Sequence, residues 1–576
     1  MVIGYVFTLI YAVLFAGLIA SALMLRKVIA KKLSNDTSLQ YLILVLVVIA
    51  FFVSFSLRYV SPVEQLYFDE NIYQGIALNI LHSGNALWCQ YGTALVTSCP
   101  YSQIYHDPVE ISFYIAIAFA IFGVGIQTAY GMSLFVGAMS ILLVFLLGSS
   151  LFGKKAGLAS AIVFALIPEL FIWSRTQATP DLIFMMFSIL AFYAYEIYRS
   201  NRNNTTLAFF LFALGISVYV RIEAILLIPI FVVLAAYEAS IKYGVKKGIG
   251  KLLGYSSTRT MAIMMVFVIL IVPEIYYIFY EIQNLNYGSG TLCGVQTNTT
   301  FSISNFKCNM VPNANFFLGS FNSVAYYPAY FSALTTIIAV IGAIVMLFKG
   351  GKNDVPIVLL GLWALVFYLF YDAFYAGSVL FGVDVRFMLI IYPAIAIFAG
   401  FGIASLSSGI PVALKLSKNK KSEAKRAIFS SAIFAVLIIV FAVFPFYNSL
   451  STVTISPSRM PQEAMPMSAT NFIYQNVAKV PSNCLVFSFT PDVWWEQNRS
   501  SAQVGWLGNG NSTFKSFENT FTCFVFDKGY WCTTPEYKSG LCSTDLSTYN
   551  TTLIVTQRAP NQIDNYSLYY IDGYKT

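Results

Sequence analysis

Hydrophobic runs of about 20 residues recur along the chain from its start to about Tyr447, and then they stop. A run of this length is what an α-helix needs to cross the apolar core of a bilayer. Of the 576 residues, 58% are hydrophobic and only 10% are charged, whereas soluble globular chains carry about 25% charged residues. The sequence therefore predicts a polytopic α-helical membrane protein, and it excludes a soluble enzyme, a disordered chain and a nucleic-acid-binding protein.

The runs predict about twelve transmembrane helices. They cover residues 3–25, 41–59, 127–150, 156–173, 181–198, 205–219, 224–238, 260–280, 329–348, 355–371, 387–406 and 427–447. The first run has no basic residue before it and is followed by Arg26 and Lys27. This order of charges favours an anchor with its N-terminus outside over a cleaved signal peptide.

The Lys and Arg residues indicate which side of the membrane each loop faces. Up to residue 447, 21 of them fall in loops predicted to be inside and 5 fall outside, which is the positive-inside bias of a membrane protein. The apolar segment Val109–Gly123 is short, and a crossing there would invert the bias of every later loop. We therefore expect it to form a re-entrant or interfacial helix within a first outer loop, residues 60–126.

All eight cysteines fall in segments predicted to be outside. An even number on one side indicates an oxidising compartment and disulfide bonds. The simplest pairings are Cys89–Cys99 and Cys293–Cys308, and the pairing of the four cysteines after the last span stays open.

The chain changes character after the last span. We expect residues 1–447 to form the membrane body and residues 448–576 to form an extracytoplasmic β-rich (α+β) domain. Alternating apolar runs predict strands at 484–490, 521–527 and 551–557, between turns rich in Asn, Ser and Gly.

Charged side chains gather at the predicted outer ends of the spans. The acids there are Glu64, Asp69, Glu70, Asp107, Glu110, Asp181, Glu223, Asp372 and Asp384, and the cations and imidazoles are Arg175, Arg221, Arg386, His82 and His106. Carboxylates can act as bases or metal ligands, and guanidiniums bind phosphate, so this face suits chemistry on a phosphorylated substrate. An ordinary belt of polar helix ends is the alternative, but acids are scarce at the inner face.

Four segments together resemble a known family. Asp69-Glu70-Asn71-Ile72-Tyr73 resembles the D-E-x-x-Y motif of the GT-C membrane glycosyltransferases, in particular of the dolichyl-phosphate-mannose protein mannosyltransferase and aminoarabinose transferase family. Tyr105-His106-Asp107-Pro108 is similar to the acid and proline that precede the second juxtamembrane helix of that family. Residues 151–181 are similar to its inner basic turn, span and outer Asp, and residues 385–400 to its R-(F/Y)-x-x-x-x-Y-P segment. The four follow in the family's order.

The chain also departs from the family's patterns. Pro108 stands where the aminoarabinose branch has a lysine that helps to hold the donor phosphate, and the C-terminal region has no β-trefoil signature. Trp494-Trp495-Glu496 is similar to the W-W-D-Y-G motif of oligosaccharyltransferases, but Gln497 and Asn498 replace its Tyr and Gly. We interpret these tryptophans as surface or core aromatics.

The resemblance implies transfer of a sugar from a polyprenyl (dolichyl) phosphate donor to a protein, glycan or lipid acceptor on the outer side of the membrane, by inverting displacement. It favours the plasma membrane of an archaeon or bacterium over the endoplasmic reticulum. Two alternatives stay open: a transporter or flippase for a lipid-linked substrate, and an oligosaccharyltransferase-like enzyme.

Candidate roles follow from the resemblance and from residue chemistry. The catalytic candidates are Asp69 as general base, Glu70 and Asp181; the donor-phosphate candidates are Arg386, Arg221 and Arg175; and the candidates for acceptor or donor contacts are Tyr73, His106, Asp107, Glu223 and Tyr392. Asp69 and Asp181 would also suit helix N-termini, and Arg221 with Glu223 would also suit a local ion pair. A divalent metal held by Asp69, Asp107 and Asp181 is compatible with these residues, and so is a metal-independent mechanism.

Overall fold

A computed structural model gives the architecture of the chain. The residues that it describes are 2–33, 36–62, 68–89, 102–104, 108–176, 180–244, 258–284, 290–292, 295–297, 301–319, 331–349, 355–374, 377–379, 383–413, 420–455, 467–508, 517–533, 549–559 and 565–574.

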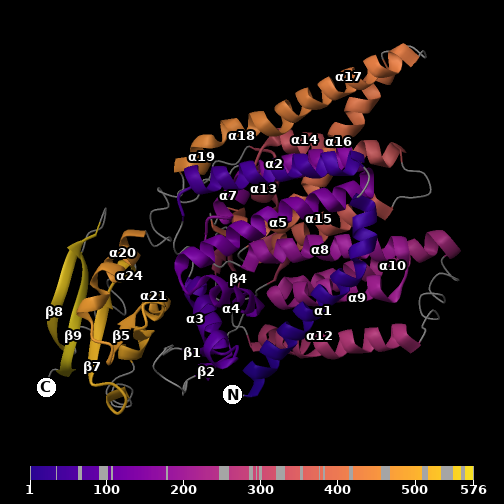
Figure 1. Ribbon diagram of the computed structural model, residues 1–576. Coiled ribbons are helices and arrows are strands. Elements are labelled where there is room, and N and C mark those ends of the chain that lie inside the picture. Colours follow the sequence, from indigo (N-terminus) through magenta and orange to yellow (C-terminus); the bar gives the residue numbers. More distant parts are fainter. Residues whose placement is uncertain are drawn as a thin grey trace.

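Helices running side by side form the membrane body (Figure 1). They are α1 (Val2–Leu33), α2 (Asp36–Tyr59), α3 (Phe68–Ser83), α4 (Glu110–Phe122), α5 (Ile126–Phe152), α6 (Lys154–Ala165), α7 (Pro168–Trp173), α8 (Pro180–Asn201), α9 (Asn204–Val220), η1 (Ile222–Leu226), α10 (Leu227–Tyr243), α12 (Thr258–Asn284), α13 (Ile303–Phe317), α14 (Ala333–Lys349), α15 (Val355–Ala373), η3 (Val383–Ile391), α16 (Tyr392–Ala413), α17 (Lys420–Ile438), η4 (Ile439–Val443), α18 (Phe444–Asn448) and α19 (Leu450–Ile455). Two short antiparallel strand pairs occur between these helices in chain order: β1 (Trp88–Cys89) with β2 (Ser102–Gln103), and β3 (Gly290–Leu292) with β4 (Val295–Thr297).

The predicted multi-pass helical architecture is confirmed. Within the described ranges, 9 helical segments are long and apolar enough to cross a membrane, and each matches a predicted span. The other three predicted spans are helical but shorter. Residues 205–219 and 329–348 correspond to α9 and α14, of 17 residues each. Residues 156–173 are divided into α6 and α7 because Pro168, which has no N–H to donate, starts a new helix.

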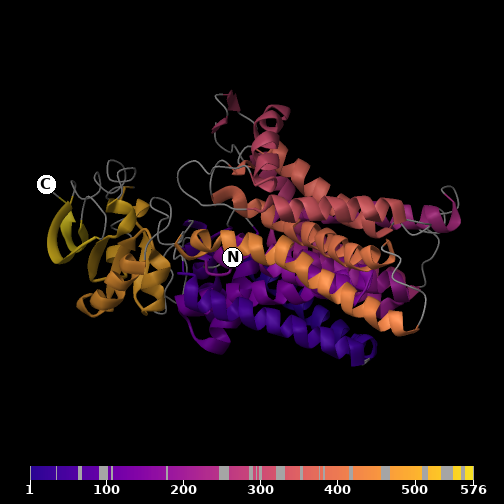
Figure 2. The same ribbon diagram turned by 90° about the horizontal axis from the view of Figure 1, so that it is seen from above.

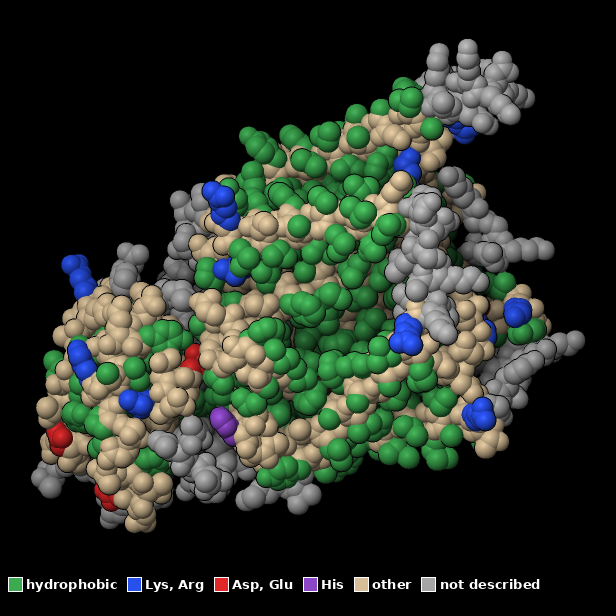
Figure 3. Space-filling view, in the orientation of Figure 1, with side chains coloured by type: hydrophobic (Ala, Val, Ile, Leu, Met, Phe, Trp, Pro, Cys, Tyr) green, Lys and Arg blue, Asp and Glu red, His purple; other side chains and the backbone are tan. Residues whose placement is uncertain are grey.

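The spans differ in how deeply they are buried. In the apolar windows of Pro180–Asn201 and Arg386–Ile410, 83% and 78% of the residues are buried, against 11% for Arg426–Asn448. The first two segments therefore form the centre of the bundle, and the third lies at its edge. Hydrophobic side chains cover the face of the bundle seen in Figure 3, as expected of a surface that contacts lipid.

Small residues allow the central helices to approach closely. A Cβ placed on Gly342 of α14 would lie 2.0 Å from the Phe398 carbonyl oxygen of α16, and one on Gly400 would lie 2.2 Å from Ser160 Oγ of α6. Helix pairs in lipid associate through such close van der Waals contact, because lipid tails give no hydrophobic driving force between helices.

The last span contains one π-helical turn, η4, followed by Pro445 in α18. Pro445 has no N–H for the carbonyl of Phe441, four residues earlier. The Thr335 hydroxyl of α14 donates a hydrogen bond to that carbonyl at 3.3 Å. A side chain of a neighbouring helix therefore supplies the hydrogen bond that the Phe441 carbonyl lacks within its own helix, as an apolar environment requires.

The C-terminal domain lies at one end of the bundle (Figures 1 and 2). Its elements are α20 (Met467–Asn476), β5 (Cys484–Ser488), α21 (Pro491–Glu496), β6 (Ser500–Gln503), α22 (Gly505–Gly508), β7 (Cys523–Lys528), α24 (Tyr530–Thr533), β8 (Tyr549–Arg558) and β9 (Asn565–Tyr574). The five strands form one sheet in the order β6-β5-β7-β9-β8, in which β5 is parallel to β6 and β7, and β9 is antiparallel to β7 and β8. The three predicted strands correspond to β5, β7 and β8.

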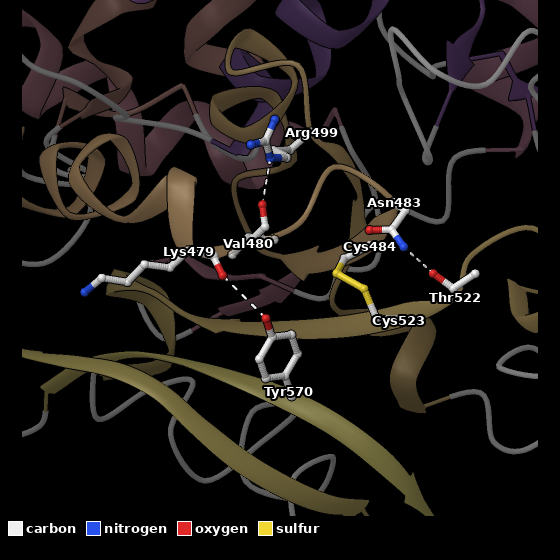
Figure 4. The surroundings of a disulfide bond; sticks show 8 residues. All are labelled: Lys479, Val480, Asn483, Cys484, Arg499, Thr522, Cys523 and Tyr570. Atoms are coloured by element: carbon white, nitrogen blue, oxygen red, sulfur yellow. Dashed lines mark hydrogen bonds between the residues drawn. A yellow bond between two sulfur atoms is a disulfide. The ribbon is translucent and has the colours of Figure 1, made fainter.

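A disulfide bond links Cys484 and Cys523, the first residues of the neighbouring strands β5 and β7 (Figure 4). Cys308 and Cys532 each form a disulfide bond as well. Disulfide formation is therefore confirmed, while the predicted pairings Cys89–Cys99 and Cys293–Cys308 include residues outside the described ranges.

Helix α21 joins the C-terminal domain to the membrane body. The Trp495 ring packs so closely on α3 that a Cβ on Gly75 would lie 2.2 Å from it. The Glu496 carboxyl accepts a hydrogen bond from the Tyr474 hydroxyl at 2.8 Å and another from the backbone N–H of Ile126, where α5 begins. Trp494 is fully buried and Trp495 is 4% exposed, so both are core aromatics.

This contact predicts a pH-dependent stability. Burial raises the pKa of Glu496 from 4.5 to about 7. Below pH 4.5 the Glu496 carboxyl is protonated in both the folded and the unfolded chain, and its contribution to the free energy of unfolding is at its maximum. Between pH 4.5 and about 7 only the unfolded chain releases this proton, so the contribution is lost as the pH rises. We expect the wild-type protein to lose about 1–3 kcal/mol between pH 4.5 and 8 relative to Glu496→Gln.

The measurement is thermal unfolding of the full-length protein in detergent, followed by tryptophan fluorescence. The exposed Glu518 supplies a matched control, Glu518→Gln. Parallel pH profiles for wild type and Glu496→Gln would contradict the assignment.

Candidate active site

Arg221 lies at the junction of α9 and η1, and its side chain joins two carboxylates. Its Nη1 donates to Asp181 Oδ1 at 2.9 Å, and its Nε donates to Glu223 Oε1 at 2.5 Å. Asp181 is the second residue of α8, and Glu223 lies in η1. The side chains of Asp181 and Glu223 are only 3% and 7% exposed, so the ion pairs are largely shielded from solvent.

Arg386 of η3 approaches the same aspartate. Its Nε lies 3.8 Å from Asp181 Oδ2. The guanidinium carbons of Arg221 and Arg386 lie 5.2 and 5.0 Å from the centre of the Phe387 ring. Two guanidiniums that are 40 and 205 residues from Asp181 in sequence are thus held around one carboxylate and one aromatic ring.

Tyr371, near the C-terminal end of α15, completes this group. Its hydroxyl donates to Glu223 Oε1 at 2.8 Å, and its ring stacks on Phe387 with 5.2 Å between the centroids. We call Asp181, Arg221, Glu223, Tyr371 and Arg386 the arginine cluster. Four of its five members were predicted from the sequence as site residues. Tyr371 was not, because a tyrosine in an apolar run has no distinguishing pattern.

Helix α13 fixes the turn that leads from α15 to η3. The Asn309 amide donates to the carbonyls of Asp372 and Phe374 at 3.0 and 2.7 Å. The Asn313 amide donates to the Asp372 carboxylate at 2.8 Å and to the Gly377 carbonyl at 3.0 Å. These bonds satisfy carbonyl groups that a helix C-terminus leaves unpaired. They position the segment that carries Tyr371 and, beyond the turn, Arg386.

The arginine cluster contains two cations and two acids. It can therefore keep both guanidiniums ionised at the bundle end without a large net charge. Guanidiniums bind phosphate through paired N–H donors. If a phosphate group reached Arg221 and Arg386, the two guanidiniums would exchange contacts with carboxylates for contacts with that phosphate.

The D-E-x-x-Y segment lies at the start of α3. Asp69 is its second residue, and its side chain is outside the described part of the structure. Glu70 and Tyr73 are each 1% exposed. An acid this deeply buried is costly unless it has polar neighbours or a function.

The remaining predicted residues have separate surroundings. The Arg175 Nε donates to the Val60 carbonyl at 3.3 Å, and its guanidinium lies over the Tyr130 ring. Tyr392 is fully buried at the start of α16. His106 and Asp107 fall outside the described residues, and so the predicted metal set of Asp69, Asp107 and Asp181 stays a prediction. Among the described residues, no group of three or more His, Cys, Asp or Glu could hold a metal ion.

Comparisons with known proteins agree with this architecture. Residues 106–277, less than half of the chain, match the family model of the dolichyl-phosphate-mannose-protein mannosyltransferases. No curated protein sequence matches the chain.

Two solved structures are similar over most of the chain. ArnT from Cupriavidus metallidurans, bound to undecaprenyl phosphate, is 12% identical with a TM-score of 0.56, covering 93% of this chain and 98% of its own. The oligosaccharyltransferase AglB from Archaeoglobus fulgidus, in complex with an inhibitory peptide and a dolichol-phosphate, is 13% identical with a TM-score of 0.51, covering 89% of this chain and 73% of its own. The chain therefore has a GT-C-type fold, which confirms the resemblance indicated by the motifs.

The arginine cluster predicts a large effect of removing its central cation. Replacing Arg221 with Leu leaves the buried carboxylates of Asp181 and Glu223 without their closest cation. Breaking one side of a buried ion pair typically costs about 3–5 kcal/mol. Arg58→Leu is the matched control, because Arg58 is exposed at the end of α2 and should change stability by at most about 0.5 kcal/mol.

Thermal or denaturant unfolding of the full-length protein in detergent would measure the difference. Equal stabilities of the two variants would show that the cluster does not depend on Arg221.

Proposed function

We propose that this chain, which shares its fold with membrane glycosyltransferases, transfers a sugar from a polyprenyl phosphate donor to an acceptor. The observation that carries the proposal is the arginine cluster. Arg221 and Arg386 come from different segments and share Asp181. A phosphate at a membrane surface needs such a pair of cations, and its apolar chain needs the adjoining lipid-facing helices.

The two structural relatives support a lipid-linked donor. ArnT was solved with undecaprenyl phosphate and AglB with a dolichol-phosphate. Both ligands combine a long polyprenyl chain with a phosphate, and this is the chemistry that the arginine cluster suits. The similarity of residues 106–277 to mannosyltransferases favours a hexose, with mannose as the first sugar to test. A glycan, a lipid and a protein are the acceptor classes to compare.

In the proposed reaction, Asp69 takes the proton from the acceptor hydroxyl while the hydroxyl oxygen attacks the anomeric carbon. Polyprenyl phosphate leaves from the opposite face, so the anomeric configuration inverts and no covalent sugar–enzyme intermediate forms. The guanidiniums of Arg221 and Arg386 stabilise the charge on the departing phosphate. Glu70 and Tyr73 follow Asp69 in α3 and are proposed to line the same site.

Asp181 has a supporting role in this proposal. Its carboxylate is held by Arg221 at 2.9 Å and approached by Arg386 at 3.8 Å. A divalent ion at Asp181 would have to compete with two guanidinium cations. We therefore propose that Asp181 orients the phosphate-binding arginines, and that the chemical step uses no metal held by Asp181.

We place the reaction on the extracytoplasmic side of a plasma membrane of an archaeon or bacterium. The support is the distribution of Lys and Arg, of which 21 fall in the predicted inner loops and 5 in the outer ones. The arginine cluster includes two of those five outer cations.

The first functional prediction concerns the base. General base catalysis typically contributes about 10²–10⁴-fold to a rate. Asp69→Asn should lower turnover by that factor and leave donor binding and folding nearly unchanged. The measurement is transfer from a radiolabelled polyprenyl-phosphate mannose by purified protein, with the anomeric configuration of the product determined by NMR. Retained configuration, or near-normal activity of the variant, would refute the assignment.

The second functional prediction separates phosphate binding from proton transfer. Arg386→Ala should raise the donor KM and lower kcat/KM by about 10²-fold or more, because a phosphate contact acts in both the ground state and the transition state. Arg58→Ala, a change at an exposed arginine, should behave like wild type. An unchanged donor KM in Arg386→Ala would place the phosphate elsewhere.

A further inference from the structure

Three asparagines lie on one face of α13. Asn305, Asn309 and Asn313 are spaced four residues apart, and each is fully buried. A buried side-chain amide is costly unless it forms hydrogen bonds. The reason for three such amides on one helix therefore lies in the groups that they bind. We call these three residues the asparagine row.

The asparagine row binds the end of α15 and the turn that follows it. Besides the bonds of Asn309 and Asn313 to carbonyls of this segment, Asn305 donates to the Ala373 carbonyl at 3.2 Å. The Asn313 Oδ1 also accepts a hydrogen bond from the Val379 N–H at 3.0 Å. One helix thus holds the backbone on both sides of the turn.

The turn is compact enough to transmit this hold. A Cβ placed on Gly377 would lie 1.8 Å from the Tyr371 carbonyl oxygen, so the chain folds back directly on the end of α15. Backbones packed this closely have no free space in which to move separately. A displacement at the asparagine row would therefore move the last turn of α15 together with the residues after it.

Two rings of this segment contact the arginine cluster. Phe374 packs edge to face on Phe387 with 5.8 Å between the ring centres, and Tyr371 stacks on the same ring at 5.2 Å. Phe387 is 5% exposed, and its ring centre lies 5.2 Å from the guanidinium carbon of Arg221 and 5.0 Å from that of Arg386. A continuous series of contacts therefore joins the asparagine row to both guanidiniums.

Guanidiniums bind phosphate through N–H groups whose direction and separation must match the phosphate oxygens. The Phe387 ring restrains both guanidiniums through cation–π contacts. We propose that the asparagine row consists of positioning residues for the donor phosphate, which act through Phe374 and Phe387 on Arg221 and Arg386. This inference rests on the function proposed above. Helix α13 thereby determines how tightly the donor binds without touching the phosphate itself.

The first test removes one amide donor and keeps the shape of the side chain. In Asn309→Asp, the carboxylate cannot donate to the Phe374 carbonyl. The donor KM should rise by about 10-fold, with a smaller change in kcat and an unchanged acceptor KM. Asn315→Asp makes the same substitution at an exposed position of the same helix, and it should behave like the wild type.

A double-mutant cycle identifies the group through which the row acts. Phe387→Leu removes the ring that joins the asparagine row to the guanidiniums. Adding Asn309→Asp to Phe387→Leu should then change the donor KM by less than about 2-fold. If Asn309 had only a structural role, its substitution would have the same effect with and without the ring.

Asn313 allows a rescue experiment. Its amide donates to the Asp372 carboxylate at 2.8 Å, so Asn313→Asp places two carboxyls against each other and should raise the donor KM by about 10-fold. Adding Asp372→Asn restores an amide beside a carboxyl. The double variant should therefore recover most of the lost affinity for the donor.

A binding measurement keeps the test independent of turnover. Polyprenyl phosphate should raise the melting temperature of the purified wild type, and the dose dependence of this rise gives a dissociation constant. If the wild type binds polyprenyl phosphate but transfers no sugar, the proposed function fails, and the same variants are compared through their dissociation constants.

Four results would overturn the inference. They are donor affinity of Asn309→Asp equal to that of the wild type, an effect of Asn309→Asp that persists undiminished in Phe387→Leu, no recovery when Asp372→Asn is added to Asn313→Asp, and no binding of polyprenyl phosphate by the wild type.

Discussion

The geometry of the candidate site depends on one guanidinium. Arg221 binds the start of α8 through Asp181 and η1 through Glu223, and it lies over Phe387 of η3. Glu223 in turn binds Tyr371 of α15. Since an Arg in a shielded position needs its carboxylates as much as they need it, these contacts form or fail together. Four segments that are distant in sequence are thereby fixed at one point.

The buried acids of the bundle differ in whether a cation lies beside them. Asp181 and Glu223 have a cation within 3 Å, whereas Glu110 and Glu274 form no ion pair with any described residue, and Glu110 accepts a hydrogen bond from the Tyr114 hydroxyl. The first pair can therefore stay ionised within the protein, because Arg221 compensates both carboxylates.

The sequence predicted the helices better than the site. Long apolar runs have one stable solution in lipid, so the spans were found, and alternating runs predicted three of the five strands of the C-terminal domain. The break at Pro168 was missed because the apolar run continues across it. Arg221 and Glu223 are two residues apart, so their pairing was considered, whereas the contacts of Asp181 with Arg221 and Arg386 depend on tertiary packing. Tyr371 was missed because it stands alone in an apolar run.

The contact between Trp495 and Gly75 links the two parts of the protein. Gly75 lies less than two turns after Asp69 on α3, at a point where the hydrogen of glycine is the largest side chain that fits. The distance between the C-terminal domain and this helix is therefore set by a direct ring-to-backbone contact. A change in the tilt of the C-terminal domain would therefore displace α3 directly, and with it the segment that begins with Asp69.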